Sequence, residues 1–240
     1  MGNRLRSQRR GKGSFTFLAT KKSRGQAKYV SLNAHQKESV LHGQVMELLT
    51  DRGRTGVLAK IVFEDNQEEM VVAAEGLQKG KHVEYGLEAE IAIGNVLPLK
   101  KIPEGCPIFA IERKAGDGGT LVLAAGLYAL IMSKDSNKAL VKLPSSKIVS
   151  LPVESRAMIG CCAGGGRQEK PLLKAGTRYH WMKSRRRHYP SIRGVAMNAF
   201  DHPFGGSQHH PGKSKSVSRH RPPGRKVGAI ASKRTGRKKK

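Results

Sequence analysis

The segment His82–Ile91, with the sequence HVEYGLEAEI, decides the fold class of this chain. Apolar side chains occupy every second position along most of it, with polar or charged side chains between them. A period of two places successive side chains on opposite faces of a strand, whereas a helix repeats its apolar face every three to four residues. The segment therefore predicts a half-buried β-strand, which we extend to His82–Ile93.

Short apolar runs of the same kind continue in both directions and end at turn sequences such as Gly116-Asp117-Gly118-Gly119. Strands at intervals of about ten residues, without a competing helical pattern, predict small barrels in an all-β fold. The region is too long for one small barrel, so two in tandem are expected, joined near Gly80–Leu97. The other expected strands are Val40–Leu49, Gly56–Phe63, Glu69–Ala74, Pro107–Arg113, Thr120–Ala124, Tyr128–Ser133, Ala139–Leu143, Lys147–Leu151 and Ala157–Ala163.

The charge of the chain is concentrated at its two ends. The 240 residues carry 45 Lys and Arg against 18 Asp and Glu, a net charge of +27. Residues 1–30 hold nine of the cations and no acid, and residues 170–240 hold 20 cations and one acid. The middle is close to neutral. Two polycationic arms on a balanced body are typical of extensions that lie along phosphate backbones; disordered solubilising tails are the alternative.

Composition also excludes several classes of protein. The apolar runs are too short for a membrane-spanning helix, and the basic N-terminal stretch lacks the apolar segment of a secretory signal. The three cysteines, two of them adjacent, give neither a disulfide framework nor a zinc spacing, so a reducing compartment is expected. A nucleic-acid partner fits these facts best.

Flat side chains and cations alternate between Tyr179 and Tyr189, where a short helix is expected over Arg178–Arg187. Aromatic rings such as that of Trp181 stack on unpaired bases, and arginines pair with phosphates. The alternative is a short helix whose aromatic residues belong to a protein core, and both readings can hold for different residues.

Other candidate sites are weaker. The histidines lack metal-ligand spacing, so RNA-facing or internally satisfied imidazoles are favoured over a zinc site. The run Gly164-Gly165-Gly166-Arg167 lacks the ending of a nucleotide-binding loop, and a tight turn or a close approach to RNA is favoured. Nothing nominates a nucleophile or an acid–base pair, so no enzyme activity is expected.

The most specific motif is Gly194–Gly206, GVAMNAFDHPFGG, which resembles the signature of the universal large-subunit ribosomal protein L-two family. Ala73–Gly76, together with Phe204 after Asp201-His202-Pro203, resembles the archaeal and eukaryotic branch, with a lean towards eukaryotic cytosolic ribosomes. Motifs that resemble the same family occur in order along essentially the whole chain: Gln8–Ser14, Gly94–Leu99, Pro103–Gly105, Gly116–Thr120, Ala163–Arg167, Lys170-Pro171, Lys174–Gly176, Arg225–Gly228 and Arg234–Arg237.

The resemblance implies an all-β fold with an oligonucleotide-binding (OB) barrel followed by an SH3-like barrel, and long basic irregular N- and C-terminal extensions. We expect a basic N-terminal extension at 1–35, the OB-like barrel at 36–85, the SH3-like barrel at 86–169 and an rRNA-threading extension at 170–240.

The resemblance also implies a structural role in the large ribosomal subunit. The chain would bind large-subunit rRNA, support the peptidyl transferase region and tRNA positioning, and contribute to subunit association. Its partners would be rRNA, neighbouring ribosomal proteins and the small subunit, with no membrane. The location would be the cytoplasmic ribosome, with nuclear or nucleolar transit during assembly if the source is eukaryotic. No cofactor of its own is expected, and Mg²⁺ only as an ion associated with rRNA. A chromatin or mRNA-packaging protein would share the charge but not the ordered motifs.

Charge and resemblance together nominate these residues as rRNA contacts: Arg4, Arg9, Arg10, Lys12, Arg167, Lys174, Arg178, Trp181, Arg185, Arg186, Arg187, Arg193, Asn198, His202, Arg225, Lys226, Arg234 and Arg237. The resemblance places the loop that contains His202 near the peptidyl transferase region. Neighbouring phosphates would favour a protonated imidazole, which is a poor base, so we expect His202 to position RNA rather than to catalyse.

Overall fold

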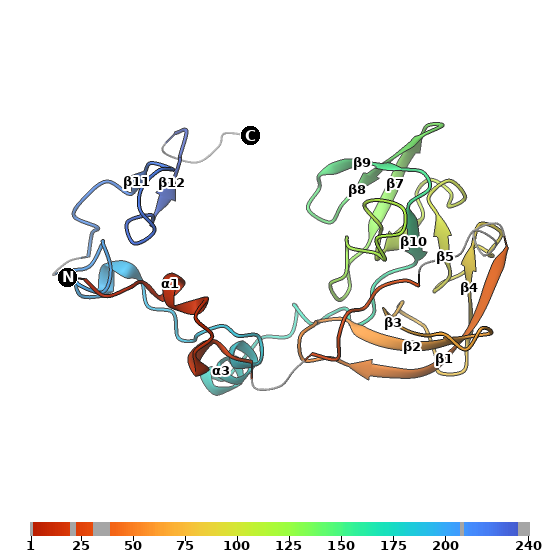
Figure 1. The fold of residues 1–240 in the computed structure, drawn as a ribbon, viewed down its shortest axis with the longest axis horizontal. Coiled ribbons are helices and arrows are strands. Elements are labelled where there is room, and N and C mark those ends of the chain that lie inside the picture. Colours follow the sequence, from red (N-terminus) through yellow and green to blue (C-terminus); the bar gives the residue numbers. More distant parts are fainter. Residues whose placement is uncertain (1, 20–22, 31–38, 207–208, 235–240) are drawn as a thin grey trace. The chain divides into compact units, whose positions relative to one another are not determined.

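The computed structural model describes residues 2–19, 23–30, 39–206 and 209–234. The chain divides into two compact units, one of residues 1–20 and 172–240 and the other of residues 21–171. We call them the arm unit and the body, and each is described by itself (Figure 1).

The body is built from one continuous sheet. Its strand order is β3-β2-β1-β4-β5-β10-β6-β7-β8-β9, and the described neighbours pair antiparallel except β4 and β5, which are parallel at Tyr85 and Val96. The strands are β1 (Val40–Thr50), β2 (Val57–Phe63), β3 (Glu68–Val72), β4 (His82–Gly86), β5 (Val96–Pro98), β6 (Pro107–Phe109), β7 (Ala129–Lys134), β8 (Lys138–Lys142), β9 (Ile148–Pro152) and β10 (Arg156–Ile159).

The first core lies against β1–β4. Burial alternates along β1, where Leu41, Gly43 and Val45 are buried and the residues between them are exposed. Gly43 is required there because a Cβ atom would lie 2.7 Å from the ring of Phe63. The ring of Tyr85 packs edge-on against that of Phe63, with centroids 5.0 Å apart. This is the packing expected of a small barrel whose inner positions are filled by side chains.

The second core lies against β5–β10 and is aliphatic. Its fully buried members come from several strands, and they include Ile108, Ile131, Val141 and Ala157. Arg156 and Glu112 form a buried ion pair, with 2.7 Å between Nη2 and Oε1. Arg156 also donates to the carbonyl of Val30 at 2.9 Å, so a segment from the N-terminal stretch is tied to the body.

That segment reaches further into the body than its basic composition indicates. Tyr29 is 6 % exposed and belongs to the first core, where its ring meets that of Tyr85 edge-on at 5.9 Å. The Tyr29 amide donates to the carbonyl of Gly118 at 3.0 Å. The predicted boundaries at residues 35, 85 and 169 stay predictions, and Tyr29 shows that folded packing begins before residue 35.

The strand that begins at His82 is shorter than expected. The alternation predicts a strand to Ile93, but β4 ends at Gly86, whose φ of +151° and close approach to the Ser39 carbonyl suit glycine alone. Ile91 and Ile93 beyond it are about half exposed, 55 % and 49 %. The expected strand at Thr120–Ala124 is also absent and contributes only an isolated bridge between Ile111 and Leu121. The short strand β5 (Val96–Pro98) lies outside the expected strands.

The arm unit holds the described helices. They are α1 (Arg6–Arg10) and α3 (Ala175–Ser184), with single 3₁₀ turns at Phe15–Phe17 and Gly194–Ala196. Two short strands, β11 (Ser216–Val217) and β12 (Ala229–Ile230), pair in parallel. The helix expected at Arg178–Arg187 is present but begins and ends three residues earlier.

The all-β prediction of an OB barrel followed by an SH3-like barrel with basic, mainly irregular extensions is confirmed. In the described ranges no helix combines the length and the apolar composition needed to cross a bilayer.

Candidate nucleic-acid interface

The two cationic arms pack against each other in one unit. Asn3 donates from its backbone amide to the carbonyl of Phe200 at 2.6 Å and from Nδ2 to Asp201 at 2.8 Å. A ring nitrogen of His188 lies 3.1 Å from an Arg6 guanidinium nitrogen. Lys183 donates to the carbonyl of Phe15 at 3.2 Å. Sequence ends that are far apart in the chain therefore form a joint cationic surface.

The N-terminal part of this surface carries four of the predicted contacts. Arg4, Arg9, Arg10 and Lys12 are all exposed, on and beside α1. The Arg9 guanidinium donates to the backbone carbonyl of Arg4 at 2.9 Å, which ties the Arg9 side chain to the segment before α1. Arg10 lies 6.0 Å from the centroid of the Phe17 ring. The helix has no acid in its first turn, so its charge is entirely positive.

Helix α3 carries the aromatic residues and has no buried residue. A helix without a buried face gains little stability from packing on its own chain, so its side chains are available to a partner. Arg185 stacks on the indole of Trp181 at 4.3 Å, and Arg178 lies over the ring of Tyr189 at 5.3 Å. Aromatic rings and guanidinium groups are both surfaces on which an unpaired base can stack. The reading of these aromatic residues as core side chains is wrong for α3.

The remaining basic residues around α3 are exposed. Lys174 precedes the helix as its N-cap residue, while Arg186 and Arg187 follow its end. Arg186 adopts a φ of +57°, in the left-handed region, so the backbone changes direction after the end of α3.

The Gly194–Gly206 segment folds into a tight loop around His202. A Cβ atom on Gly194 would lie 2.2 Å from the His202 ring, and one on Gly205 would lie 2.2 Å from the Asn198 carbonyl. The Asn198 carbonyl in turn accepts the amides of Asp201 and His202 at 3.0 and 3.1 Å. The glycines are therefore needed for packing inside the loop, and Asn198 and Arg193 lie on its exposed side.

The imidazole of His202 is engaged within the loop. Its Nδ1 accepts the Phe204 amide at 3.0 Å, and burial lowers the pKa of His202. Both effects favour the neutral ring, because a proton on Nδ1 would break that hydrogen bond. In the protein without RNA, His202 therefore favours the neutral imidazole, whereas neighbouring phosphates would favour the protonated one. The hydrogen bond supports the expectation that His202 positions the loop rather than acts as a base, because its Nδ1 already accepts the Phe204 amide.

The C-terminal contacts lie around the β11–β12 pair. Arg225 and Arg234 are exposed and Lys226 is partly buried. Arg237 lies outside the described residues. The amide of Ala229 donates to the Lys215 carbonyl at 2.8 Å, which fixes this cationic stretch to the neighbouring one.

Arg167 is the one predicted contact in the body, exposed in the turn after β10. The glycine run before it packs on the protein itself. A Cβ atom on Gly126 would lie 2.8 Å from the Cα of Gly165, and Gly164 adopts a φ of +91°. The tight-turn reading of this run is therefore supported, with Arg167 at its exposed end.

Among the described residues, no three His, Cys, Asp or Glu side chains gather as metal ligands. The absence of a resident cofactor stays a prediction.

Sequence reasoning missed Asn3, Arg6 and Lys183, which hold the arms together. The signal available for them was weak, because each is one polar residue among many and its partner lies far away in the sequence.

Two family models match the chain. Residues 1–85 match "Ribosomal Proteins L2, RNA binding N-terminal domain", and residues 92–226 match "Ribosomal Proteins L2, C-terminal domain". Curated relatives named large ribosomal subunit protein uL2 match over the whole length of both chains. The relative from Methanothermobacter thermautotrophicus is 46 % identical over 241 residues, and that from Methanocaldococcus jannaschii is 50 % identical over 242 residues. A relative from Methanococcus maripaludis is 50 % identical over 240 residues, which is 99 % of this chain and all of that one.

These relatives are archaeal. They support the archaeal side of the predicted branch, and the lean towards eukaryotic cytosolic ribosomes gains no support from them. The relatives carry the name of a ribosomal protein and not that of an enzyme, in agreement with the expectation from the sequence. With both family models and full-length relatives in agreement, this chain belongs to the ribosomal protein L2 family.

Proposed function

We propose that the chain is a structural, rRNA-binding component of the large ribosomal subunit. Within the subunit it supports the peptidyl transferase region and tRNA positioning, and it contributes to association with the small subunit. Its partners are large-subunit rRNA and neighbouring ribosomal proteins, and it acts in the cytoplasmic ribosome. Nucleolar transit applies only if the source is eukaryotic. Mg²⁺ takes part only as an ion associated with rRNA.

The charge of the arm unit is the observation that carries this proposal. Residues 1–20 contribute five Lys and Arg and residues 172–240 contribute 19, against the single acid Asp201. Asp201 is itself hydrogen-bonded to Asn3. So much like charge in one compact unit repels itself unless a polyanion neutralises it. The full-length relationship to uL2 supports rRNA as that polyanion.

Association with the subunit is tested directly in cells of a related archaeon. A tagged copy of the chain should replace the native uL2, sediment with large subunits and remain there after a high-salt wash. Release at moderate salt into a chromatin or messenger-RNA fraction would contradict the proposal and support the packaging alternative.

Support of the peptidyl transferase region is tested with His202→Gln. The variant should weaken subunit assembly or tRNA positioning, because it removes the Nδ1 acceptor that holds the Phe204 amide. Single-turnover peptide-bond formation across pH should stay close to normal in subunits of verified protein and rRNA content. A loss of about 100-fold together with loss of the pH dependence is what removal of a general base gives, and it would contradict a positioning role.

The contribution to subunit association is tested by sucrose-gradient sedimentation. Large subunits assembled without the chain should couple to small subunits less completely at limiting Mg²⁺, and added protein should restore coupling. Equal coupling with and without the chain would remove this part of the proposal.

A further inference from the structure

The loop from Arg113 to Thr120 has a backbone shape that glycine makes possible. Gly116, Gly118 and Gly119 adopt φ angles of +85°, +81° and +83°. A Cβ atom on Gly119 would lie 2.5 Å from the carbonyl oxygen of Ala110. Other residues rarely adopt these angles, so the sequence specifies one conformation for the loop.

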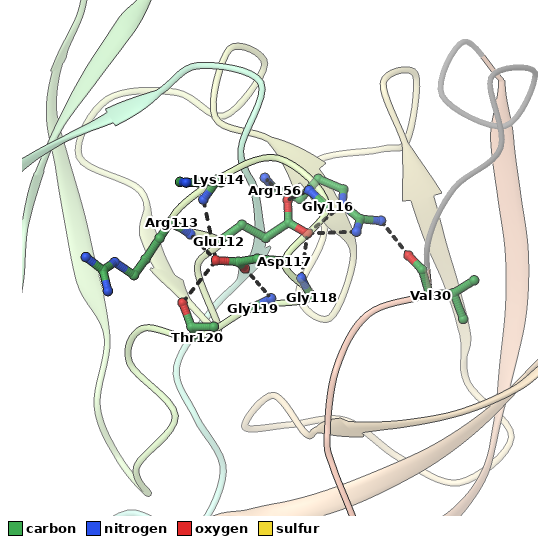
Figure 2. A network of polar contacts seen from close by, with 10 residues as sticks. All are labelled: Val30, Glu112, Arg113, Lys114, Gly116, Asp117, Gly118, Gly119, Thr120 and Arg156. Carbon is green, nitrogen blue, oxygen red and sulfur yellow. Dashed lines mark hydrogen bonds and ion pairs between the residues drawn. The ribbon is translucent and has the colours of Figure 1, made fainter.

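Two carboxylates hold that conformation from the inside (Figure 2). Asp117 accepts the amides of Arg113, Lys114 and Gly119 at 3.0, 3.4 and 3.1 Å and the hydroxyl of Thr120 at 3.3 Å. Glu112 accepts the amides of Gly116 and Gly118 at 3.2 and 3.1 Å while paired with Arg156. The acidic groups of the loop are therefore engaged by its own backbone and by a buried arginine.

The cations of the loop point the other way. Arg113 and Lys114 are exposed, and no ion pair found among the described residues includes them. In Figure 2 the Arg113 guanidinium points away from both carboxylates. The loop thus directs its negative charge inward and its positive charge outward.

A third cation adjoins the loop from the N-terminal stretch. The backbone amide of Tyr29 donates to the Gly118 carbonyl at 3.0 Å, and the backbone amide of Lys28 donates to the Met70 carbonyl at 3.1 Å. A Cβ atom on Gly118 would lie 2.8 Å from the Cβ of Lys28, so Lys28 passes directly over the loop with its side chain exposed. Lys28 therefore adds a third exposed cation of the body beside Arg113 and Lys114.

We propose that the 113–120 loop is an RNA-binding site in the body, at which Arg113, Lys114 and Lys28 pair with backbone phosphates of rRNA. Arg113 offers a planar fork for a phosphate, and the lysines add point charges. Because the backbone is already held, little conformational entropy is lost on binding. The 113–120 loop itself lies outside residues 1–85, the part matched by the RNA-binding family model, and of the three cations only Lys28 belongs to that part. This inference rests on the proposed function and adds a place of contact to it.

The first test is a cross-link from Ala115, which is exposed beside the two cations. A photoreactive amino acid at this position of the full chain is allowed to assemble into large subunits and is then irradiated. A cross-link to large-subunit rRNA is expected. Full occupancy in subunits with cross-links to protein only, or with none, would overturn the loop site and leave the proposed function standing. Failure of the unmodified chain to enter subunits would overturn the proposed function, and the loop site with it.

The second test measures affinity of the full chain for an rRNA fragment that contains the cross-linked position. Arg113→Gln with Lys114→Gln should lower the affinity and reduce the salt slope by about 1.4 to 1.8, as loss of two phosphate contacts requires. The matched control is Lys138→Gln with Lys142→Gln, which removes the same charge from exposed positions on β8. Equal losses in the two double variants would overturn the assignment.

The substitution Asp117→Asn distinguishes the effect of the fixed loop conformation on RNA binding from the effect of net charge. The substitution removes a negative charge, so electrostatics alone predicts tighter RNA binding. It also sets an amide group against backbone N–H donors, so the loop loosens and the affinity should fall. Tighter binding by this variant would overturn the role of the held conformation.

Discussion

At the scale of single residues, Glu69 is the most unusual group in the body. It is 5 % exposed, and neither its carboxylate oxygens nor the hydroxyls of Tyr29 and Tyr85 have a hydrogen-bond partner among the described residues. Burial raises the pKa of Glu69 from 4.5 to about 8, an effect that the Val30 backbone and the charge of Arg156 offset only in part. The folded chain therefore holds a neutral Glu69 at neutral pH.

This leads to a prediction for Glu69→Gln. The wild-type folded state binds one more proton than the unfolded state between about pH 4.5 and 8, so its stability falls as pH rises through that window. The glutamine has no such cost, and the variant should gain about 1.4 kcal/mol relative to wild type for each pH unit crossed. Urea unfolding at pH 5 and pH 8 measures the difference. Glu68→Gln, at the exposed neighbour paired with Lys60, is the control and should show little change. A Glu69→Gln difference that does not depend on pH would contradict the buried proton.

His202 gives a second prediction at this scale. Burial lowers its pKa, and its Nδ1 accepts the Phe204 amide. In the free protein His202 should therefore titrate below the usual value of about 6.5. Its contribution to loop stability is present above that value and is lost as pH falls through the lowered pKa. NMR titration of the imidazole carbons measures the pKa, and a value at or above 6.5 in the free protein would contradict the assignment.

At the scale of elements, α3 combines stacking and charge in one short helix. Trp181 is the only tryptophan of the chain, so its fluorescence reports on this helix alone. The guanidinium carbon of Arg185 lies over the Trp181 ring, 4.3 Å from the centroid. Stacking and phosphate pairing differ in their response to salt, because only the second releases counterions.

We predict different effects for two substitutions on this element. Trp181→Leu removes the stacking platform and should lower the affinity for a single-stranded large-subunit rRNA segment by about 5- to 150-fold, which corresponds to 1–3 kcal/mol, with the salt slope unchanged. Arg187→Gln removes an exposed cation and should make the slope shallower by about 0.7. Binding titrations at several salt concentrations measure both. An unchanged affinity for Trp181→Leu would mean that α3 contacts RNA through charge only.

The strands also show which features of the fold can be predicted from sequence patterns. The strands β1, β2, β7, β8 and β9 were predictable to within a residue or two, because local alternation sets which face is buried. The end of β4 was not, because Gly86 ends the strand against Ser39, a neighbour far away in the sequence. Tyr29 was missed since one aromatic residue in a basic stretch gives no periodic signal. In the candidate site, the types of residue were predictable from charge and motif. The pairing of Asn3 with Asp201 was not, because the two residues are 198 positions apart in the sequence.

At the scale of the whole molecule, the separation of charge between units governs RNA affinity. If about eight to ten phosphates are engaged, the logarithm of the affinity should fall with the logarithm of salt concentration with a slope of about −6 to −9. The 12 Lys and Arg of residues 213–240 account for a large share of the cations.

Truncation at residue 212 tests this distribution. The slope should become clearly shallower, because the β11–β12 pair and the cations around it are lost together. A filter-binding series with large-subunit rRNA from 0.1 to 0.5 M salt is the measurement. A truncated chain with the full slope would mean that the C-terminal segment is not on the phosphate backbone.

The bond between Arg156 and the Val30 carbonyl has a consequence for synthesis of the chain. The two residues are 126 positions apart, so Val30 leaves the ribosome long before its partner exists. At about 5–20 residues per second, the delay is about 6 to 25 s. Tyr85 and Gly118 are made during that interval, but the guanidinium that lies over the Tyr29 ring at 5.5 Å is added only with Arg156. The enclosure of Tyr29 is therefore completed only after synthesis has passed residue 156.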